Sequence, residues 1–466
     1  MKLIATNHKC TIIIAIMVNI SFNSSLFAQI DSINSNRVEN NNSVKYWSMD
    51  ECMLYGIKHS TSVKKKEFEL STTKMDKVAA ITAFLPNVNA SISGGWNWGR
   101  NIDPNTNTYS NLTTFNNNYD ISASMTLFDG GQLYNQLRLA RIANKQGYNE
   151  VQRAHDEKAI EVMQAYIDVV YYQEYKRIAK KKLSESLLTL KKTESQFELG
   201  IKGKLDVAQV KAQVAEDDYN VIHQDNLFKS AMLKLKSVMN CPITDSILVD
   251  TIKFSIIPEI DLNQSEDIYN RASIANPQAI AAKLNEKNYK MQYNISKGRF
   301  IPTITLSGRI STNYNRELSG ENNSESFKYQ FNNKMGKGVM ATLSIPIFNN
   351  LNNLSSMRRA RNLWKIAQVD KEENLKNLRI NIEQAVMDCN GYAKEIIQMV
   401  DKVQSDSLAY QAAKRKYEEG LLNAIDLQTS SNTLLNSQVT LLQKRLLYTI
   451  KKRLVEYYKN NTFIYE

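Results

Sequence analysis

Residues 128–131 (FDGG) and the 68 residues that follow them, Gln132 to Leu199, decide the fold of this chain. The run contains no proline, its single glycine is Gly147, and Gly200 ends it. A continuous helix of this length would span ~100 Å at about 1.5 Å per residue, more than a globular domain needs. A new helical pattern begins near Leu205. The sequence therefore predicts a very long helix that ends at Gly200 and is followed by a second helix.

The same arrangement recurs later in the chain. Residues 348–350 (FNN) open a second proline-free run, which reaches residues 417–420 (YEEG). Three pairs of equivalent residues are each 220 positions apart: Phe128 and Phe348, Gly200 and Gly420, and Asp206 and Asp426. Self-similarity at a fixed spacing indicates tandem copies of one structural unit. We therefore predict two repeats, residues 47–246 and 247–466, each with a helix, two strands and two long helices in that order.

The N-terminus has the features of a secretory signal. Lys2 and Lys9 are basic, residues 11–20 are apolar, and residues 26–28 (LFA) fit a cleavage site. The apolar run is too short to span a membrane as an uncleaved anchor. We predict a signal peptide over residues 1–28 and a polar tether over residues 29–46.

Charge and cysteine content exclude several classes of protein. Removing Lys2 and Lys9 lowers the formal net charge from +12 to +10. Such a charge can indicate nucleic-acid binding, but the basic residues alternate with acidic ones along the helices, and a secreted chain does not meet nucleic acid. The remaining cysteines, Cys52, Cys241 and Cys389, have neither the spacing of a metal site nor the even number of a disulfide framework. We predict no nucleic-acid partner, no metal and no cofactor.

The sequence also lacks the motifs of an enzyme. The four histidines stand alone at positions 8, 59, 155 and 223, and there is no HExxH motif or glycine-rich phosphate loop. The adjacent acidic residues Asp217 and Asp218 lie in a helical pattern, and we expect both to be solvated. The chain is therefore predicted not to be an enzyme.

Four segments of about ten residues alternate apolar and polar side chains, which indicates β-strands. They begin near residues 87, 119, 303 and 339. Helices are predicted from Ser48 to about Phe84 and again up to about Phe300, polar loops at residues 99–118 and 315–337, and a linker between the repeats at residues 241–262. The apolar faces carry the residues that we predict to contact lipid: Ile92, Trp96, Ile304, Leu306, Ala341 and Leu343. The opposite faces carry small polar residues such as Ser91, Thr305 and Thr342.

A half-buried sheet over a protein core would show the same alternation. Two features favour a membrane barrel instead. The polar faces carry few charges, as a wet lumen would, and the strand length fits an apolar band ~25 Å tall crossed at a tilt. In addition, a phenylalanine marks each of the four junctions between strand and helix: Phe84, Phe128, Phe300 and Phe348. Four aromatic residues at equivalent places predict an aromatic girdle at a membrane interface.

Four strands are too few to close a barrel, because membrane barrels have at least eight. In lipid every backbone polar group must be paired, so the chain must share its sheet with copies of itself. Over about residues 47–460 the sequence resembles the TolC-like outer-membrane efflux channels. The resemblance rests on the tandem repeat, the junctions at residues 84–86 (FLP) and 300–302 (FIP), the FDGG turn, and the two matching turns FELGIKGKLD and YEEGLLNAID.

This resemblance implies a mixed α and β membrane protein that assembles as a homotrimer. Each chain would supply four strands of a shared 12-stranded β-barrel in the outer membrane of a Gram-negative bacterium, above a long α-helical barrel in the periplasm. The implied function is that of a passive channel-tunnel in tripartite efflux or type I secretion. The implied partners are outer-membrane lipid, a periplasmic adaptor (membrane fusion) protein, and an inner-membrane RND or ABC-type transporter. The cargo and the pump class are left open.

The resemblance also implies roles for particular residues. Gly200 and Gly420 would lie in the turns that contact the adaptor, and Asp206, Tyr417 and Asp426 would form a periplasmic entrance, or gate. We expect Tyr417 to hydrogen-bond to Asp206 and three Asp426 carboxylates to form a ring; alternatively, Asp426 caps its helix. The family often has an arginine at the position of Leu422 and an acidic residue at that of Thr429. The closing network is therefore weaker here or uses Lys202 or Lys204.

A secreted structural coiled-coil protein or adhesin is the alternative interpretation. It accounts for the long helices, but it leaves the four alternating strands and their phenylalanine borders unexplained.

Overall fold

The computed structural model describes residues 46–102, 107–250, 265–318 and 325–463 of the 466-residue chain. The predicted signal peptide and most of the predicted tether lie outside these residues. The elements below belong to one unit, Tyr46–Glu466. None of the described helices combines the length and the apolar character needed to cross a membrane.

The first repeat contains, in chain order, β1 (Tyr46–Trp47), α2 (Met49–His59), α3 (Thr61–Thr82), β2 (Asn87–Ile102), β3 (Tyr109–Phe128), α4 (Gln132–Glu198) and α5 (Lys204–Met239). The second contains β4 (Leu248–Val249), α6 (Ser265–Ala275), α7 (Pro277–Gly298), β5 (Thr303–Glu317), α8 (Phe327–Asn333), β6 (Gly336–Ser344), α9 (Asn352–Glu418) and α10 (Ala424–Asn460). Each end of α4 lies 220 positions before the corresponding end of α9. The mixed, helix-rich tandem repeat is as predicted.

The single helix predicted at the start of each repeat was wrong, because each is two helices. Ser60 separates α2 from α3, and its hydroxyl accepts a hydrogen bond from the Val63 amide at 3.3 Å. Asn276 separates α6 from α7 and caps α7, with Pro277 in the first helical turn. The side chains of Ser60 and Asn276 accept hydrogen bonds from free amides in the first turn of the next helix, which favours a helix start at these positions. Pro277 and its counterpart Thr61 are both the first residues of the second helix.

The sheet has the order β2-β3-β5-β6, and each neighbouring pair is antiparallel. The polar loop predicted at residues 99–118 was too long, since β2 runs to Ile102 and β3 starts at Tyr109. Asparagine and threonine here are held by backbone pairing between the two strands, which overrides their preference for turns. The fourth strand lies three residues earlier than predicted, at Gly336–Ser344.

Three short elements, α8, β1 and β4, were not predicted at all. Helix α8 occupies the expected loop at residues 315–337, where β5 also extends to Glu317. In the expected linker, β4 pairs in parallel with β1. The hydroxyl of Tyr166, buried on α4, is within hydrogen-bonding distance of the carbonyl oxygens of Trp47 (3.2 Å) and Asp250 (3.0 Å), which fixes this pair against the helix.

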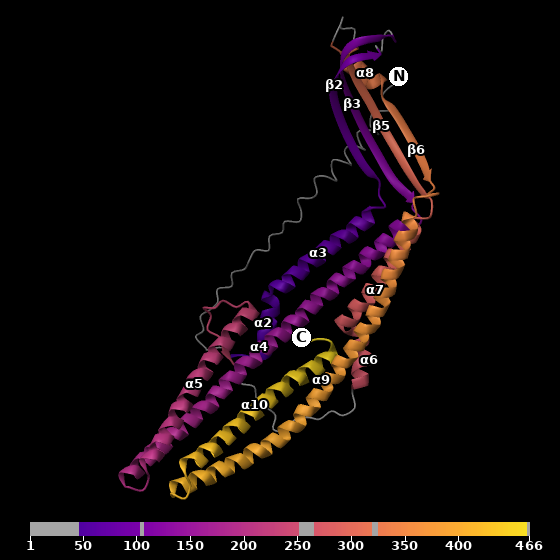
Figure 1. The fold of residues 1–466 in the computed structure, drawn as a ribbon. Coiled ribbons are helices and arrows are strands. Elements are labelled where there is room, and N and C mark those ends of the chain that lie inside the picture. The colour runs from indigo at the N-terminus through magenta and orange to yellow at the C-terminus, as the bar shows by residue number, and fades with distance from the viewer. Residues whose placement is uncertain (1–45, 103–106, 251–264, 319–324, 464–466) are drawn as a thin grey trace, which may run out of the picture. The chain divides into compact units, whose positions relative to one another are not determined.

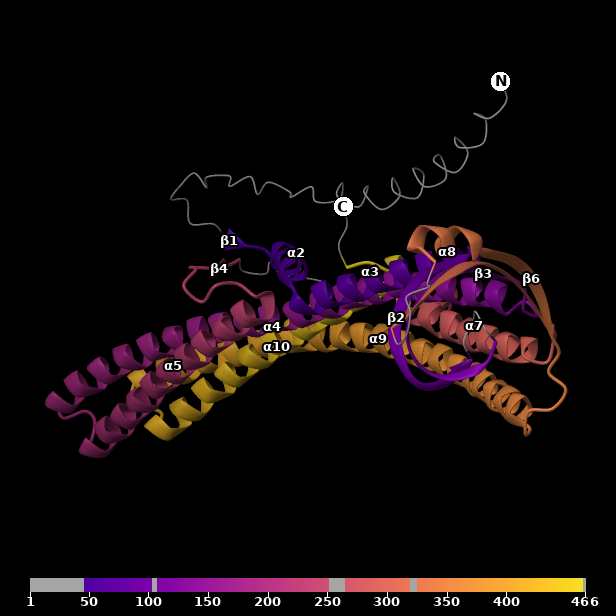
Figure 2. The ribbon, with the colours of Figure 1, turned by 90° about the horizontal axis from the view of Figure 1, so that it is seen from above.

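The long helices form two antiparallel hairpins, α4–α5 and α9–α10, that extend away from the sheet in the same direction (Figures 1 and 2). Helices α2 and α3 pack on α4, and α6 and α7 pack on α9, while α7 also contacts α4. The main core lies midway along α4, where Val162, Met163 and Tyr166 pack against Leu235 and Met239 of α5. The sheet therefore lies at one end of the hairpins and their turns at the other.

The FDGG turn fits closely against the end of α7. Gly130 has φ +70°, and a Cβ built there would lie 2.6 Å from the carbonyl oxygen of Gly298. Glycine is required for both reasons, because an L side chain is strained at this φ and has no room. The same turn joins the sheet to the longest helix of the repeat.

We predict that Gly130→Ala destabilises the chain by about 1–3 kcal/mol through strain and the clash with Gly298. The control is Gly391→Ala in α9, where nothing lies within 4 Å of the added Cβ. That variant should gain about 0.5–1 kcal/mol from helix propensity. Thermal unfolding followed by circular dichroism measures both; equal melting temperatures for the two variants would contradict the close packing.

Candidate functional site

The two hairpin turns have the same backbone geometry. Gly200 has φ +74° and Gly420 has φ +79°, and nothing lies within 4 Å of a Cβ built at either. The amide of Ile201 donates to the Gln196 carbonyl and that of Leu421 to the Lys416 carbonyl, each at 2.8 Å. These bonds close a left-handed helix ending, which glycine adopts without strain. The turns predicted at Gly200 and Gly420 are therefore present, and both are open to contact.

The helices that follow the turns start differently. A carboxylate oxygen of Asp206 accepts a hydrogen bond from the Gly203 amide at 3.2 Å. In the second repeat Asn423 caps α10, because its side-chain oxygen accepts from the Asp426 amide at 2.8 Å. The exposed Asp426 carboxylate has no hydrogen bond or ion pair among the described residues. Asp426 therefore does not cap its helix, and its carboxylate is free at the turn. Asp206, in contrast, helps to cap the start of α5.

Tyr417 lies buried between the two hairpins. Its hydroxyl is 3.0 Å from the Thr193 hydroxyl on α4, and the Lys202 ammonium lies 4.1 Å from the centre of its ring. The predicted bond to Asp206 was wrong within this chain, because Thr193 occupies that partner's place. Burial raises the pKa of Tyr417, and the negative charge of Asp206 adds to the shift. Tyr417 therefore remains a neutral hydrogen-bonding group.

Further contacts join the hairpins beside Tyr417. Lys192 forms an ion pair with Glu418 at 2.8 Å, and the Gln196 side chain donates to the Glu418 carbonyl at 2.9 Å. The Lys202 ammonium lies 3.5 Å from the Leu422 carbonyl oxygen. Of the two lysines proposed for the closing network, Lys202 makes the contacts.

A buried ion pair farther from the turns was missed by the sequence analysis. The Lys182 ammonium on α4 lies 3.0 Å from an Asp217 carboxylate oxygen on α5 and donates to the Asn432 side chain on α10 at 2.6 Å. Asp217 is 2% exposed, so its predicted solvation was wrong. Its neighbour Asp218 is exposed, as expected. Asp217 is paired with a residue of the neighbouring helix α4, and no local sequence pattern signals that contact.

Strand register assigns the predicted lipid-facing residues to one face of the sheet. Leu306 lies opposite Met125 and Ala341, and Ile304 opposite Leu343. Directly opposed residues share a face. Ile92 and Trp96 reach the same face through their partners on β3, Tyr119 and Phe115.

The other face is polar. Thr305 lies opposite Thr126 and Thr342, and Arg309 of β5 forms an ion pair with Asp120 of β3. The predicted separation of apolar and polar rows is therefore present in the sheet.

The four border phenylalanines lie at junctions between the sheet and the helices. Phe84 follows α3, Phe128 ends β3, Phe300 follows α7, and Phe348 precedes α9. All four side chains are exposed, by 40–75%. Exposed aromatic rings at equivalent junctions are available for contact with a membrane interface or a neighbouring chain.

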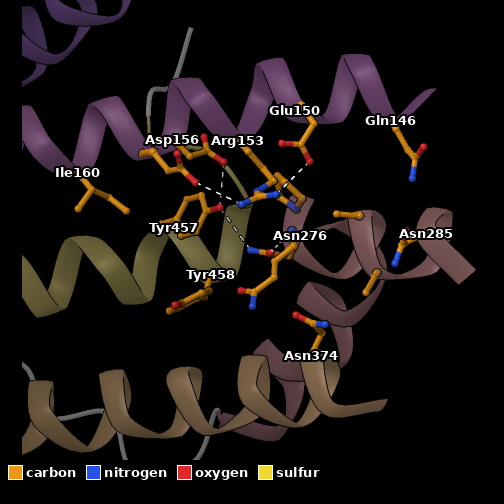
Figure 3. A pocket seen from close by; sticks show the side chains of 15 residues that line it. Gln146, Glu150, Arg153, Asp156, Ile160, Asn276, Asn285, Asn374, Tyr457 and Tyr458 are labelled. Atoms are coloured by element: carbon orange, nitrogen blue, oxygen red, sulfur yellow. Dashed lines mark hydrogen bonds and ion pairs between the residues drawn. The ribbon is translucent and has the colours of Figure 1, made fainter. Parts of the chain in front are cut away.

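A polar cavity of about 630 Å³ is lined by side chains of α4, α7, α9 and α10 (Figure 3). At its inner wall the buried Asp156 accepts hydrogen bonds from Tyr457 and Gln152, each at 2.9 Å. Asn276 donates to the Tyr457 hydroxyl at 3.4 Å. Arg153 pairs with Glu150 at 3.0 Å. Burial raises the pKa of Asp156 to about 6, against the effect of its hydrogen bonds.

Within the described ranges, no cluster of three or more His, Cys, Asp or Glu residues could hold a metal ion. The cavity is lined by three carboxylates and an arginine, which are already paired with one another or with neighbours. The candidate site therefore has two parts: the polar contacts between the two hairpins, and a sheet with one apolar and one polar face.

Comparison with known proteins was made on sequence and on structure. The family described as outer membrane efflux protein matches residues 57–240 and 268–454. The chain is 19% identical over 298 residues to the outer membrane protein TolC of Vibrio cholerae, covering 62% of this chain and 65% of that protein. This chain thus spans just under two thirds of that curated relative.

Two solved structures share the fold. The structure of CusC has a TM-score of 0.77 at 16% identity and covers 88% of this chain and 91% of its own. The structure of VceC from Vibrio cholerae has a TM-score of 0.76 at 14% identity, with 88% and 96% covered.

The raised pKa of Asp156 predicts a pH-dependent stability. A carboxyl group whose folded-state pKa lies above its unfolded value contributes stability below about pH 4, and that contribution is lost as the pH rises through about 6. Asp156→Asn should therefore raise the free energy of unfolding by about 3 kcal/mol at pH 7.5 and by close to nothing at pH 4.

Apparent melting temperatures of wild type and variant across this pH range provide the measurement. Asp76→Asn, at an exposed position of α3, controls for the loss of one carboxylate. A wild type that is more stable than Asp156→Asn at pH 7.5 would contradict the assignment.

Proposed function

Because the chain belongs to the outer membrane efflux protein family, we propose that it is the outer-membrane channel-tunnel of a tripartite efflux or type I secretion system. The chain is a TolC-like protein of the outer membrane. In this proposal it exports cargo passively, and an inner-membrane RND or ABC-type pump supplies the energy through a periplasmic adaptor.

One observation carries the proposal: an apolar-faced, four-stranded sheet whose edge strands are β2 and β6. In lipid, unpaired backbone groups at such edges are strongly unfavourable. Pairing β6 of one copy with β2 of the next removes every edge when three copies assemble. Three times four strands gives twelve, an even number within the range of outer-membrane barrels.

The hairpins supply the tunnel below this barrel. Helices α4 and α9 each have 67 residues, which corresponds to ~100 Å at about 1.5 Å per residue. Three copies of both hairpins, arranged around the barrel axis, would enclose a passage through the periplasm. Adaptor tips would contact the open turns at Gly200 and Gly420.

The residues near the turns would form the closed entrance. Tyr417, packed on Thr193 and Lys202, holds the second hairpin to the first, and the free Asp426 carboxylate recurs three times around the axis. Rings of carboxylates attract cations into a narrow pore. Asp206 would contribute to the closed entrance in two ways: it caps the start of α5 at Gly203, and its negative charge lies near Tyr417.

The lipid face generates the first test. Leu306→Arg should prevent assembly of a heat-labile trimer extracted from outer membranes, because a charge at mid-membrane costs about 2–4 kcal/mol. Thr305→Arg, one residue away on the polar face, is the matched control and should assemble. Heated and unheated samples on denaturing gels report the trimer. Equal assembly of the two variants, or a detergent-free soluble monomer of the mature wild type, would refute the barrel.

The entrance generates the second test, by single-channel conductance in planar bilayers. Asp426→Asn should lower cation selectivity, whereas Asp401→Asn, which removes the same charge from an exposed position of α9 away from the turn, should not. Tyr417→Phe should raise open probability, because it removes three hydroxyl contacts per trimer at ~1 kcal/mol each. Variants that conduct like wild type would limit Asp426 and Tyr417 to the structure of the turn.

A further inference from the structure

Helix α8 lies beside the sheet, at the end away from the long helices (Figure 1). Its Phe327 and Phe331 pack edge-on against Tyr119, with ring centres 6.1 and 5.3 Å apart. Phe327 also packs against Tyr314. Tyr119 lies opposite Thr312, two residues before Tyr314, so these sheet residues share one face. That face is the one that carries Ile92, Leu306 and Ala341.

The helix is fixed by polar bonds as well as by rings. The buried side chain of Gln330 accepts from the Asn315 amide at 3.1 Å and donates to the Asn315 carbonyl at 2.9 Å. Thr312 donates to the Phe331 carbonyl at 2.8 Å. Strand β6 pairs with β5 only as far as Ser311. Beyond Ser311, the Gln330 side chain bonds to the β5 backbone in place of a neighbouring strand. Helix α8 is thus packed and hydrogen-bonded against the sheet.

The outer surface of α8 combines apolar and basic side chains. Phe327, Tyr329 and Met335 are 40–53% exposed. The exposed cations around them are Arg316, Lys328, Lys334 and Lys337. Lys337 lies opposite Ile310, and Arg316 opposite Phe115, which assigns both to the apolar face.

These cations have no acidic partner among the described residues. Lys334 donates to the neutral Gln330 side chain at 2.7 Å. Of the nearby acidic residues, Glu317 alternates to the polar face, and Glu325 is exposed just before the helix. Cations on a lipid-contacting face are unfavourable unless they reach an anionic head group, to which long lysine side chains can extend.

We propose that α8 and its flanking lysines form a binding site for the phosphate groups of the glycolipid in the outer leaflet. The proposal rests on the proposed function, since it requires the apolar face of the sheet to contact lipid. The aromatic side chains would lie at the boundary between acyl chains and head groups, where such rings are favoured. Lys328, Lys334 and Lys337 would then neutralise phosphate at the level of the head groups.

The test is lipid binding by native mass spectrometry of the intact protein in mild detergent. The probe is diphosphoryl lipid A, compared with the same glycolipid lacking its phosphates. The triple substitution Lys328→Gln, Lys334→Gln and Lys337→Gln should weaken binding of the diphosphoryl form on the order of 100-fold at low salt. Wild-type binding should also weaken as salt increases, because the charges are exposed.

The matched control is the triple substitution Lys58→Gln, Lys64→Gln and Lys65→Gln, which removes the same charge from exposed positions far from the sheet. It should bind lipid A like wild type. Equal affinity of the α8 variant and wild type, or equal affinity of wild type for both glycolipids, would overturn the site. Loss of the trimer in the α8 variant without added lipid would assign the helix to subunit contact and overturn it as well.

Conductance of the same samples in phosphatidylcholine bilayers separates the two proposals. A wild type that conducts but does not discriminate between the glycolipids overturns the lipid site alone. A wild type that forms neither trimer nor channel overturns the proposed function and, with it, the lipid site.

Discussion

Backbone hydrogen bonding at the sheet edges is the constraint on which this structure depends. Within the chain, β3 and β5 are paired on both sides, whereas β2 and β6 each have one neighbour. In the proposed barrel, the apolar face places these edges in an environment without water, where unpaired amides and carbonyls are costly. Helix α8 shows the same constraint on a small scale, because Gln330 pairs with the Asn315 backbone where β6 has ended. In this proposal, edge pairing decides both what the chain assembles with and where it can end a strand.

The tandem repeat preserves backbone geometry and varies side chains. Gly200 and Gly420 make equivalent turns, and α4 and α9 have equal lengths. The residues after the turns differ between the repeats. Lys202 of the first repeat corresponds to Leu422 of the second, and the glycine cap at position 203 corresponds to an asparagine at 423. As a result, Asp206 is used to hold its own helix start, whereas Asp426 is not. Duplication gives two hairpins of the same shape, and these few substitutions give them different charges at the turn.

The periodicity of apolar residues and the positions of proline and glycine made most of the fold predictable from sequence. Proline-free runs located α4 and α9, and glycine located both turns, because these signals act within a few residues. The failures involve contacts between distant segments. Asp217 looked solvated but is buried and paired with Lys182, and the asparagine-rich ends of β2 and β3 looked like a loop but are paired. The Tyr417 partner was assigned by resemblance, and Thr193, on a different helix, could be identified only from the packing.

The strength of packing between the hairpins decreases from their middle toward the turns. The central cluster contains residues such as Tyr166, Met163, Leu235 and Leu446 from four or more elements, whereas the cluster beside the turns contains only Val210, Tyr410, Tyr417, Ala424 and Leu427. Separating helices at the middle would expose far more apolar surface than separating the tips, and the free energy cost scales with that area. The tips are held together instead by polar contacts such as Lys192–Glu418 and Lys182–Asn432. Exposed ion pairs and single hydrogen bonds between side chains each contribute little stability. A structure of this kind can open at the turns while the helices near the sheet stay packed, which is the mechanical property that an entrance at the tips requires.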